Sequence, residues 1–252
     1  MQLVTYNLRC EWDSYDGINA FVHRAGMIYD KINKEKPDAI AFQEVIPESL
    51  EFLKRIFPEY AFYGQLRTKN FDDEGLYTAI KRDVYDVTAY ETFWLSPNPY
   101  EPGSRFQEQS EFPRICILTD IRNRKNGFRM RIMNVHLDNI SDYARLLGIQ
   151  CALQKAEEYQ KKNPLPLAVL GDFNAFPGSD PICACEKFGL ADATDDQKIT
   201  FHRWGKEEKK IDYIFISKDL KSNGSFVWDD TRCGIYLSDH YPVGVLLEEK
   251  IK

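Results

Sequence analysis

The hydrophobic pattern of the chain switches repeatedly between the period of a strand and the period of a helix. Apolar or alternating runs predict strands at residues 3–6, 39–42, 76–80, 84–94, 115–121, 128–135, 167–170, 213–216 and 241–247. Residues 48–57 predict an amphipathic helix, and an earlier helix is expected to end before Pro37. The buried face of that earlier helix is expected to consist of Val22, Ala25, Tyr29 and Ile32.

A hairpin and a long helix are predicted near the middle of the chain. Asn126-Gly127, the dipeptide most typical of a tight hairpin turn, joins the strands expected at 115–121 and 128–135. Ser141 is expected to cap a helix that ends near Asn163. The buried stripe of this helix is expected to be Leu146, Ile149, Leu153 and Ala156.

Two halves of the sequence meet near this helix, at residues 141–163, and each half mixes hairpins with helices. This arrangement predicts an α/β sandwich in which two mixed sheets pack together and helices cover the outside. No repeat, low-complexity segment or interdomain linker interrupts the chain. We therefore expect residues 1–252 to form a single domain, although a prior of about one domain per 150 residues also allows two small ones.

Composition narrows the class of protein. The 252 residues are 43% hydrophobic and 29% charged, which excludes a disordered or fibrous chain. No apolar run reaches the roughly 18–20 residues of a membrane span. With 33 Lys and Arg against 39 Asp and Glu, the net charge of −6 disfavours a long nucleic acid as partner, because phosphate contacts dominate such binding. We expect a monomer that takes a small phosphorylated substrate.

One basic run departs from this acidic balance. Its members lie on and beside the expected hairpin: Arg122, Arg124, Lys125, Arg129 and Arg131. Nucleic-acid binding is one explanation. A charged exposed face that protects edge strands is the other, and it is the one we favour.

Cysteine usage and the N-terminal residues bear on the compartment. The six cysteines are scattered, and the one close pair, Cys183 and Cys185, lacks the spacing of a zinc or redox site. A chain of this size does not need disulfides. The run at 3–6, directly after Met1, predicts a strand and not a signal peptide. We expect a cytoplasmic protein.

Polar residues with catalytic chemistry follow or precede the expected strands. They are Asn7, Glu44, His136, Asp172, Asn174, Asp212, Asp239 and His240. Each has a structural alternative when taken alone, such as a turn residue, a solvated carboxylate or a buried histidine. Because loops at the ends of strands present functional groups on a rigid scaffold, the set together predicts one site.

The chemistry of this set favours a metal-assisted hydrolase. Carboxylates and an amide without cysteine suit a hard cation, Mg²⁺ or Mn²⁺. The histidines and remaining aspartates are then free for acid–base work on an attacking water. Neither a Walker loop nor a nucleophile elbow occurs in the sequence. Metal-assisted hydrolysis of a phosphoester is the reaction class that fits best.

Six motifs carry a family resemblance. In chain order they are Thr5-Tyr6-Asn7, Gln43-Glu44, Asn134-Val135-His136-Leu137-Asp138, Gly171-Asp172-Phe173-Asn174, Ile211-Asp212-Tyr213-Ile214-Phe215 and Ser238-Asp239-His240-Tyr241-Pro242-Val243. The chain resembles the endonuclease/exonuclease/phosphatase superfamily, and within it a compact bacterial branch. That superfamily includes deoxyribonuclease I, apurinic endonucleases, deadenylases, neutral sphingomyelinases and inositol polyphosphate 5-phosphatases. The resemblance implies a four-layer, deoxyribonuclease I-like sandwich with the site at one end.

The resemblance also implies a metal centre for Mg²⁺ or Mn²⁺. Glu44 matches the principal metal carboxylate. Asn7 lies beside it and orients the metal or the phosphate, and Asp239 matches an accessory carboxylate on the metal side.

The catalytic roles follow from the same resemblance. Asp172 matches the residue that positions or deprotonates the attacking water, and Asn174 the one that holds a phosphoryl oxygen. His240 matches the histidine at the scissile phosphate, and Asp212 its carboxylate partner. We predict a hydrogen bond of roughly 2.6–3.2 Å between these two side chains. His136 matches a second histidine that stabilises the pentacovalent state or protonates the leaving oxygen.

Substrate recognition is less determined by the sequence. Phe112-Pro113-Arg114 and Thr200-Phe201-His202 are typical of the bacterial branch, and we expect Arg114 and His202 to bind substrate. Val135 and Asn139 replace a threonine and a histidine of the pattern N-T-H-L-D-H, which indicates a specialised pocket on that side. The predicted function is a metal-dependent phosphodiesterase or phosphatase on a small, lipid or sugar phosphate. A nuclease and a non-catalytic binding protein on the same scaffold are the alternatives.

Overall fold

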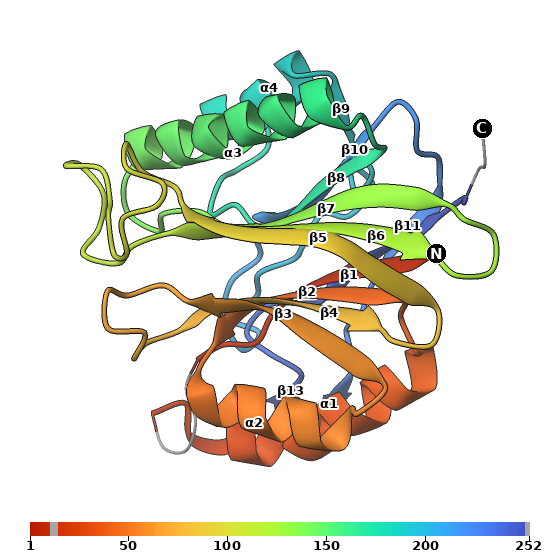
Figure 1. Cartoon of the computed structure of the whole chain (residues 1–252). Coiled ribbons are helices and arrows are strands. Elements are labelled where there is room, and N and C mark those ends of the chain that lie inside the picture. The colour runs from red at the N-terminus through yellow and green to blue at the C-terminus, as the bar shows by residue number, and fades with distance from the viewer. Residues whose placement is uncertain (11–14, 250–252) are drawn as a thin grey trace.

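Fourteen strands, four α-helices and one 3-10 helix make up the computed structural model, which describes residues 1–10 and 15–249 (Figure 1). The helices are η1 (Gly17–Asn19), α1 (Phe21–Glu35), α2 (Pro47–Ile56), α3 (Asp142–Lys162) and α4 (Asp180–Lys187). One sheet contains β1 (Gln2–Asn7), β2 (Ala39–Val45), β3 (Tyr60–Leu66), β4 (Gly75–Lys81), β11 (Ser222–Val227) and β14 (Val243–Leu247). The second contains β5 (Tyr85–Trp94), β6 (Ile115–Asn123), β7 (Arg129–His136), β8 (Leu167–Asp172), β9 (Leu190–Asp192) and β10 (Asp212–Ser217). A small ribbon pairs β12 (Thr231–Arg232) with β13 (Ile235–Tyr236).

The two six-stranded sheets pack face to face, with α1 and α2 outside the first sheet and α3 and α4 outside the second (Figure 1). Strand order is β11-β14-β1-β2-β4-β3 in the first sheet and β5-β6-β7-β8-β10-β9 in the second. Parallel pairs β1–β2 and β7–β8 make both sheets mixed. The prediction of a four-layer α/β sandwich is confirmed.

Three apolar layers separate the four layers of backbone. Between the sheets, side chains such as Leu3 and Val245 of the first meet Ile132 and Leu170 of the second. One further cluster lies under α1 and α2, and another lies under α3 and α4. In the described part of the chain, no helix is both long and apolar enough to cross a bilayer.

Every strand and helix expected from the sequence is present, but the division into halves at 141–163 is wrong. Helix α3 joins two neighbouring parallel strands, β7 and β8, of the same sheet. The chain instead passes from one sheet to the other between β4 and β5 and returns after β10. Strand β14 then pairs antiparallel with β1, so the two ends of the chain meet in one sheet.

The buried face of α1 also differs from the expectation. Ile32 is buried as predicted, but Val22 and Tyr29 are 44% and 46% exposed. The fully buried residues between them are Arg24 and Ile28. The Arg24 guanidinium donates to the backbone oxygens of Asn19, Leu8, Leu237 and Arg9. An arginine that donates to buried carbonyl oxygens can face the core of the protein. A prediction that places only hydrophobic residues on the buried face therefore misses Arg24 and wrongly includes Val22 and Tyr29.

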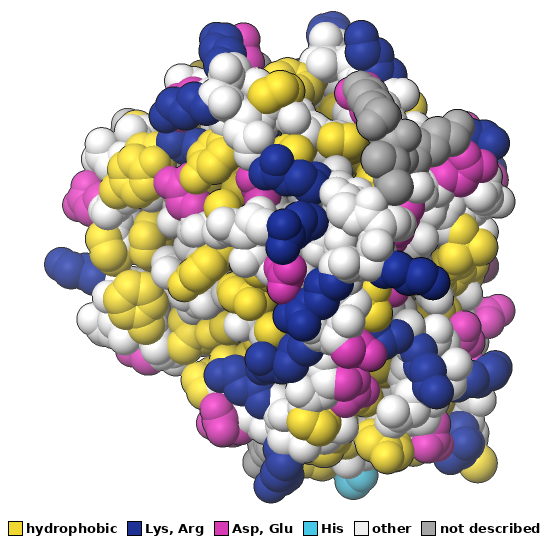
Figure 2. Space-filling view, turned by 45° about the vertical axis from the view of Figure 1, so that its right-hand side comes forward, with side chains coloured by type: hydrophobic (Ala, Val, Ile, Leu, Met, Phe, Trp, Pro, Cys, Tyr) yellow, Lys and Arg dark blue, Asp and Glu magenta, His cyan; other side chains and the backbone are white. Residues whose placement is uncertain are grey.

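The basic run lies on two central strands and the turn between them, so its explanation as edge protection is wrong. β6 and β7 are flanked on both sides within their sheet. Arg122 and Arg124 pair with the two oxygens of Asp86 at 3.0 and 2.9 Å, and Arg131 is buried against Asp120. Figure 2 shows Lys and Arg side chains interspersed with Asp and Glu across one face of the molecule. Three of the run's five side chains thus pair with carboxylates, and one of the three is buried, which does not favour a nucleic-acid surface.

The buried pair of Arg131 and Asp120 gives a stability prediction. Arg131 Nε and Nη2 each lie 2.7 Å from an oxygen of Asp120, and both side chains are almost fully buried. Arg131→Met should lower the free energy of unfolding by about 3–5 kcal/mol, because it leaves a buried carboxylate unpaired. Urea unfolding measures this, with Arg122→Met at an exposed pair as control, for which a change within about 0.5 kcal/mol is expected. A loss below about 1 kcal/mol in Arg131→Met would contradict the prediction.

Strand direction brings the candidate residues together. The parallel pairs end side by side, so that Asn7 is opposite Gln43 and His136 opposite Asp172. The chain termini lie at the other end of the sheets (Figure 1). Gly171 permits the close approach of β8 to β7, because a Cβ at its φ of +146° would lie 1.8 Å from the carbonyl oxygen of Val135.

Candidate active site

A cavity of about 920 Å³ opens at this end of the sandwich. Its walls come from loops that follow strands of both sheets. The lining includes Glu44, Glu74, Arg114, His136, Asn139, Asp172, Asn174, Asp239 and His240. Of the predicted site residues, Asn7 and Asp212 lie directly behind this wall, where they contact Glu44, Asp172 and His240. The strand-end residues therefore form one cluster.

Asn7 links the carboxylates of the two sheets. Its Nδ2 donates to Glu44 Oε1 at 3.1 Å and to Asp172 Oδ2 at 3.0 Å. Its Oδ1 accepts a hydrogen bond from the backbone N–H of Arg9 at 2.9 Å. The amide thus fixes the position of two carboxylates. Its part as a metal ligand stays a prediction.

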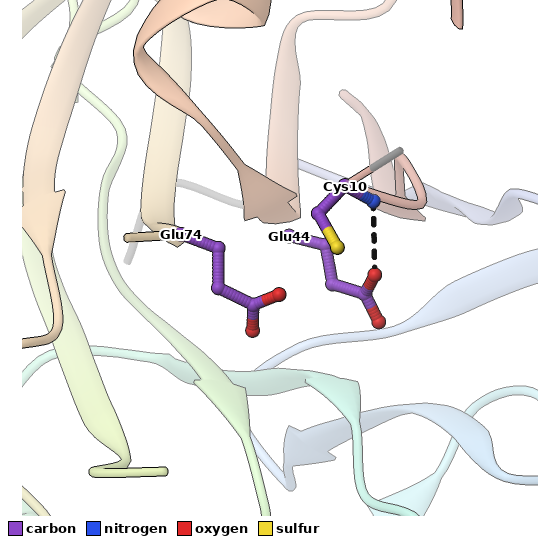
Figure 3. A group of neighbouring side chains, drawn as sticks. All are labelled: Cys10, Glu44 and Glu74. Carbon is purple, nitrogen blue, oxygen red and sulfur yellow. Dashed lines mark hydrogen bonds between the residues drawn. The ribbon is translucent and has the colours of Figure 1, made fainter. Parts of the chain in front are cut away.

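Glu44 and Glu74 enter the same space from neighbouring strands, together with Cys10 (Figure 3). One ligand atom of each residue lies within 4.8 Å of the others, and the backbone N–H of Cys10 donates to Glu44 Oε2 at 3.0 Å. Burial and the nearby charge of Glu44 raise the pKa of Glu74 to about 7. Burial favours the neutral form of Glu44 too, but the hydrogen bond from Asn7 and the charge of His240 outweigh it and lower its pKa.

The donor set of this cluster fits a hard divalent cation. The half-buried carboxylate of Glu44 and the buried one of Glu74 lie in the same space. A cation between them would relieve the repulsion that contributes to the raised pKa of Glu74. Burial raises the pKa of the Cys10 thiol, so oxygen atoms are the anionic ligands. Asp239 also lines the cavity, and its Oδ2 lies 4.0 Å from Arg9 Nε. Burial raises the pKa of Asp239 as well.

Glu74 is the residue that the sequence analysis missed. It directly precedes β4 and is the last residue of an acidic run, Asp72-Asp73-Glu74. Nothing in the sequence distinguishes Glu74 from the two aspartates before it. Only Glu74 of the three is buried, and its carboxylate pairs with the guanidinium of Arg67. Its position immediately before a strand was the one available signal.

His240 lies between two carboxylates. Its Nδ1 is 2.9 Å from Asp212 Oδ2, within the predicted range, and its Nε2 is 3.7 Å from Asp172 Oδ2. Burial alone would lower the pKa of His240, but the negative charges of Asp212 and Asp172 outweigh it and raise the pKa to about 10. The imidazole is therefore cationic at neutral pH.

Asp172 has the opposite electrostatic character. Burial and the charge of Asp212 raise its pKa to about 7. Its Oδ1 accepts a hydrogen bond from the backbone N–H of Asn174 at 2.8 Å. Asn174 adopts a left-handed conformation with φ of +48°, and its Nδ2 donates to the carbonyl oxygen of Leu137. Asp172 is thus a carboxylate held in place whose pKa suits proton transfer near neutral pH.

His136 approaches Asp172 from the side opposite to Asp212. Its Nε2 is 3.5 Å from Asp172 Oδ2, and its Nδ1 is 3.8 Å from Glu74 Oε1. Burial and the positive charges of Arg114 and Arg67 hold the pKa of His136 well below its usual range. The two histidines therefore differ in charge, and only His240 is cationic at neutral pH.

The two predicted substrate-binding residues lie in different surroundings. Arg114 lines the cavity beside Asn139. His202 is not part of the lining, because its ring stacks on Tyr241 at 4.1 Å and packs against Tyr236 behind the wall. Its neighbours Phe201 and Arg203 line the cavity instead. Contact between His202 and substrate has no support from this position.

Comparisons with known proteins agree with the fold and the motifs. A family model described as Endonuclease/Exonuclease/phosphatase family matches residues 4–240. A functionally unknown conserved protein from Enterococcus faecalis is similar in structure, with 25% identity, a TM-score of 0.90, and coverage of 99% of this chain and 100% of that chain. An endonuclease/exonuclease/phosphatase from Bacteroides vulgatus gives 24% identity and a TM-score of 0.92 over 99% and 98% of the two chains.

A third solved structure has a described activity. It is a mannosyl-6-phosphatase from Bacteroides thetaiotaomicron, with 25% identity and a TM-score of 0.88 over 98% of this chain and 99% of that chain. A search of curated proteins finds no significant match.

Proposed function

Because the chain belongs to the endonuclease/exonuclease/phosphatase family, we propose that it is a phosphoesterase that depends on Mg²⁺ or Mn²⁺ and acts on a small phosphorylated substrate such as a sugar phosphate. The observation that carries this proposal is that His240 and Asp172 line one cavity with the Glu44 carboxylate, while Asp212 holds His240 from behind the wall. Two carboxylates, a cationic imidazole and a hard-ligand cluster are the groups that water attack on a phosphoester requires.

Asp172, His240 and His136 have different catalytic roles, which follow from their charge and position. Asp172 orients the attacking water and accepts its proton, a role that matches its pKa of about 7. His240 donates from Nε2 to a phosphoryl oxygen as negative charge builds there, and Asp212 keeps its ring charged and turned correctly. His136 is neutral and stabilises the leaving oxygen from the other side of Asp172.

Glu44 would hold the metal as the principal carboxylate, and Glu74 and Asp239, which line the same cavity, would supply further oxygen ligands. A divalent cation held there would neutralise charge on the phosphoryl oxygens. Asn7 and the backbone N–H of Cys10 keep the two oxygens of Glu44 in fixed positions.

The cavity supports a small substrate more than a polymer. Its volume of about 920 Å³ suits a compact ligand, and its walls carry Phe112, Phe176 and Trp204 against which a sugar ring can pack. The net charge of −6 repels a long polyanion. The mannosyl-6-phosphatase at 25% identity supports a phosphorylated sugar.

Glu44→Gln tests the metal requirement. Mn²⁺ binding, measured by isothermal titration calorimetry, and kcat/KM should fall together, the latter by about 10²-fold or more, because the variant loses an anionic oxygen ligand. Glu51→Gln, at an exposed position of α2, is the matched control and should bind and turn over as the wild type does. Full activity of Glu44→Gln in EDTA would contradict the metal requirement.

A panel of substrates tests the proposed reaction itself. Phosphomonoesters, phosphodiesters and oligonucleotides are assayed with Mg²⁺ and with Mn²⁺, and turnover of a small ester is expected. Cation-dependent turnover of bis-(p-nitrophenyl) phosphate or of p-nitrophenyl phosphate would separate an enzyme from a binding protein. Turnover of oligonucleotides alone would contradict the small-substrate proposal.

A further inference from the structure

The guanidinium of Arg114 is buried beside the reaction centre with hydrogen-bond donors unused. Only 5% of the residue is exposed, and its Nε and Nη1 have no hydrogen-bond partner. Its one hydrogen bond runs from Nη2 to Asn139 Oδ1 at 3.1 Å. A buried cation with unmade hydrogen bonds destabilises a fold, and such groups are typical of sites that a ligand completes.

The carboxylates around Arg114 are occupied by other donors. Glu74 Oε1 lies 3.8 Å from Nη1 but is bound by Arg67. Asp138 Oδ1 lies 3.9 Å from Nε, and this carboxylate already accepts hydrogen bonds from Ser110 and from the backbone of residues 140 and 141. The free donors of Arg114 are therefore available to an anion in the cavity that Arg114 lines.

Other arginines on this wall are already committed. Arg67 binds Asp73 and Glu74, and Arg145 binds Asp142 and the carbonyl oxygen of Asp138. His136, whose Nε2 lies 3.5 Å from Asp172 Oδ2, is neutral because burial and the charge of Arg114 lower its pKa. Among the described residues on this side, Arg114 is thus the cation whose donors are left for substrate, and His240 is its counterpart on the other side of Asp172.

We propose that Arg114 binds the phosphoryl group undergoing hydrolysis and that the substrate is a phosphate monoester, an inference that rests on the proposed function. A monoester carries up to two negative charges on three non-bridging oxygens, whereas a diester carries one charge on two. Cationic groups on both sides of Asp172 match the dianion, and the fork of Arg114 supplies donors for the additional oxygen. Water attacks phosphorus and gives a proton to Asp172, the bond from phosphorus to the ester oxygen breaks, and the leaving oxygen takes up a proton, so that inorganic phosphate and the alcohol are released.

The test compares p-nitrophenyl phosphate with bis-(p-nitrophenyl) phosphate in the wild type and in Arg114→Gln. The wild type should prefer the monoester. Arg114→Gln should lower kcat/KM for the monoester by about 10²-fold and for the diester by less than about 10-fold, because the lost contact is to the oxygen that only the monoester has. Arg114→Lys keeps the positive charge but not the guanidinium. Its kcat/KM for the monoester should lie between those of the wild type and Arg114→Gln. Arg129→Gln, an exposed arginine at the far end of β7, is the control.

Phosphate binding and stability provide readouts apart from turnover. Inorganic phosphate should raise the Tm of the wild type and should inhibit it, and Arg114→Gln should weaken both effects by about 10-fold in phosphate concentration. Without phosphate, the Tm of Arg114→Gln should stay close to that of the wild type, because the substitution removes two buried donors that have no hydrogen-bond partner but also weakens the charge balance of Glu74 and Asp138. A large fall in Tm without a change in phosphate affinity would show a structural role and overturn the proposal.

The remaining outcomes separate this inference from the function it rests on. If Arg114→Gln loses equal activity on both esters, the monoester assignment is overturned and the phosphoesterase function stands. The same holds if the variant keeps the wild-type rate on p-nitrophenyl phosphate and loses activity only on substrates with a second anionic group. Absence of turnover of either ester by the wild type with Mg²⁺ and Mn²⁺ would instead overturn the proposed function.

Discussion

Replacing Asp172 by asparagine is expected to lower kcat by about 10³-fold and to leave KM within a few-fold of the wild-type value. The carboxylate lies 3.5 Å from His136 Nε2 and 3.7 Å from His240 Nε2, at the centre of the site. An amide of the same shape retains the hydrogen bond from the Asn174 backbone but cannot accept a proton from water. The loss therefore falls on the chemical step and not on substrate binding.

The same substitution should not destabilise the fold. The pKa of Asp172 is raised to about 7, so the folded protein holds a proton that the unfolded chain releases at about pH 4. Stability consequently falls as the pH rises from about 4 to 7, and the cost is fully present above that range. Asp172→Asn avoids this cost but loses the hydrogen bond that Asn7 Nδ2 donates to Oδ2. Without metal, the two effects oppose each other, so its Tm should stay near the wild-type Tm, and the comparison should favour the variant more at about pH 8 than at about pH 5.

Kinetics and urea unfolding of the Asp172→Asn variant distinguish a catalytic role of Asp172 from a structural one. Asp180→Asn, at the exposed first residue of α4, is the matched control and should leave kcat unchanged and stability within about 1 kcal/mol of the wild type. A fall of several kcal/mol in the free energy of unfolding of Asp172→Asn would indicate a structural carboxylate. An unchanged kcat would exclude Asp172 as the proton acceptor.

Strand-end residues could be predicted from the sequence because local patterns determine where strands stop. The apolar run before Gly171 ends at Asp172, and the run after Asp212 begins there, so the chain itself marks both positions. Parallel pairing then places the marked ends at one edge of the sandwich. Strand β3 was not predicted, because it is a half-exposed edge strand interrupted by Gly64 and lacks a clear alternation.

Burial of charged residues is what the sequence could not show. Arg24, Arg114 and Glu74 are each buried by contacts with segments distant in the chain. Their composition and neighbours in sequence are those of surface residues, and only the tertiary structure supplies the carbonyls, amides and counter-charges that make their burial possible. The departure at Asn139 becomes interpretable for the same reason, since its side chain accepts the one hydrogen bond of the Arg114 guanidinium.

Asp212→Asn is expected to lower kcat by on the order of 10²–10⁴-fold with little change in KM, although Asp212 does not line the cavity. Asp212 acts through His240, whose Nδ1 lies 2.9 Å from its carboxylate. The backbone N–H of Asp212 is held by Thr200 Oγ1 at 3.0 Å, so the position of the side chain survives the substitution. What the variant loses is the negative charge that keeps the imidazole cationic and correctly oriented.

A pH profile distinguishes this positioning role from a merely structural one. The pKa of His240 is raised to about 10 by Asp212 and Asp172, so the wild type should keep the cationic donor up to strongly alkaline pH. Removal of the Asp212 charge lowers the pKa of His240, and the alkaline limb of kcat/KM should move toward neutral pH. An unchanged alkaline limb in Asp212→Asn would contradict the assignment even if kcat falls.

The double variant Asp212→Asn/His240→Ala tests whether the two residues act as one unit. If they do, removing the second residue after the first costs little further activity. His240→Ala removes the phosphoryl donor, and no cation then remains for Asp212 to hold at that position. Asp212→Asn combined with His240→Ala should therefore have nearly the kcat of His240→Ala alone. Two independent roles would instead give losses that multiply, which corresponds to additive activation free energies in a double-mutant cycle. Multiplied losses would separate Asp212 from His240 and assign the carboxylate a function of its own.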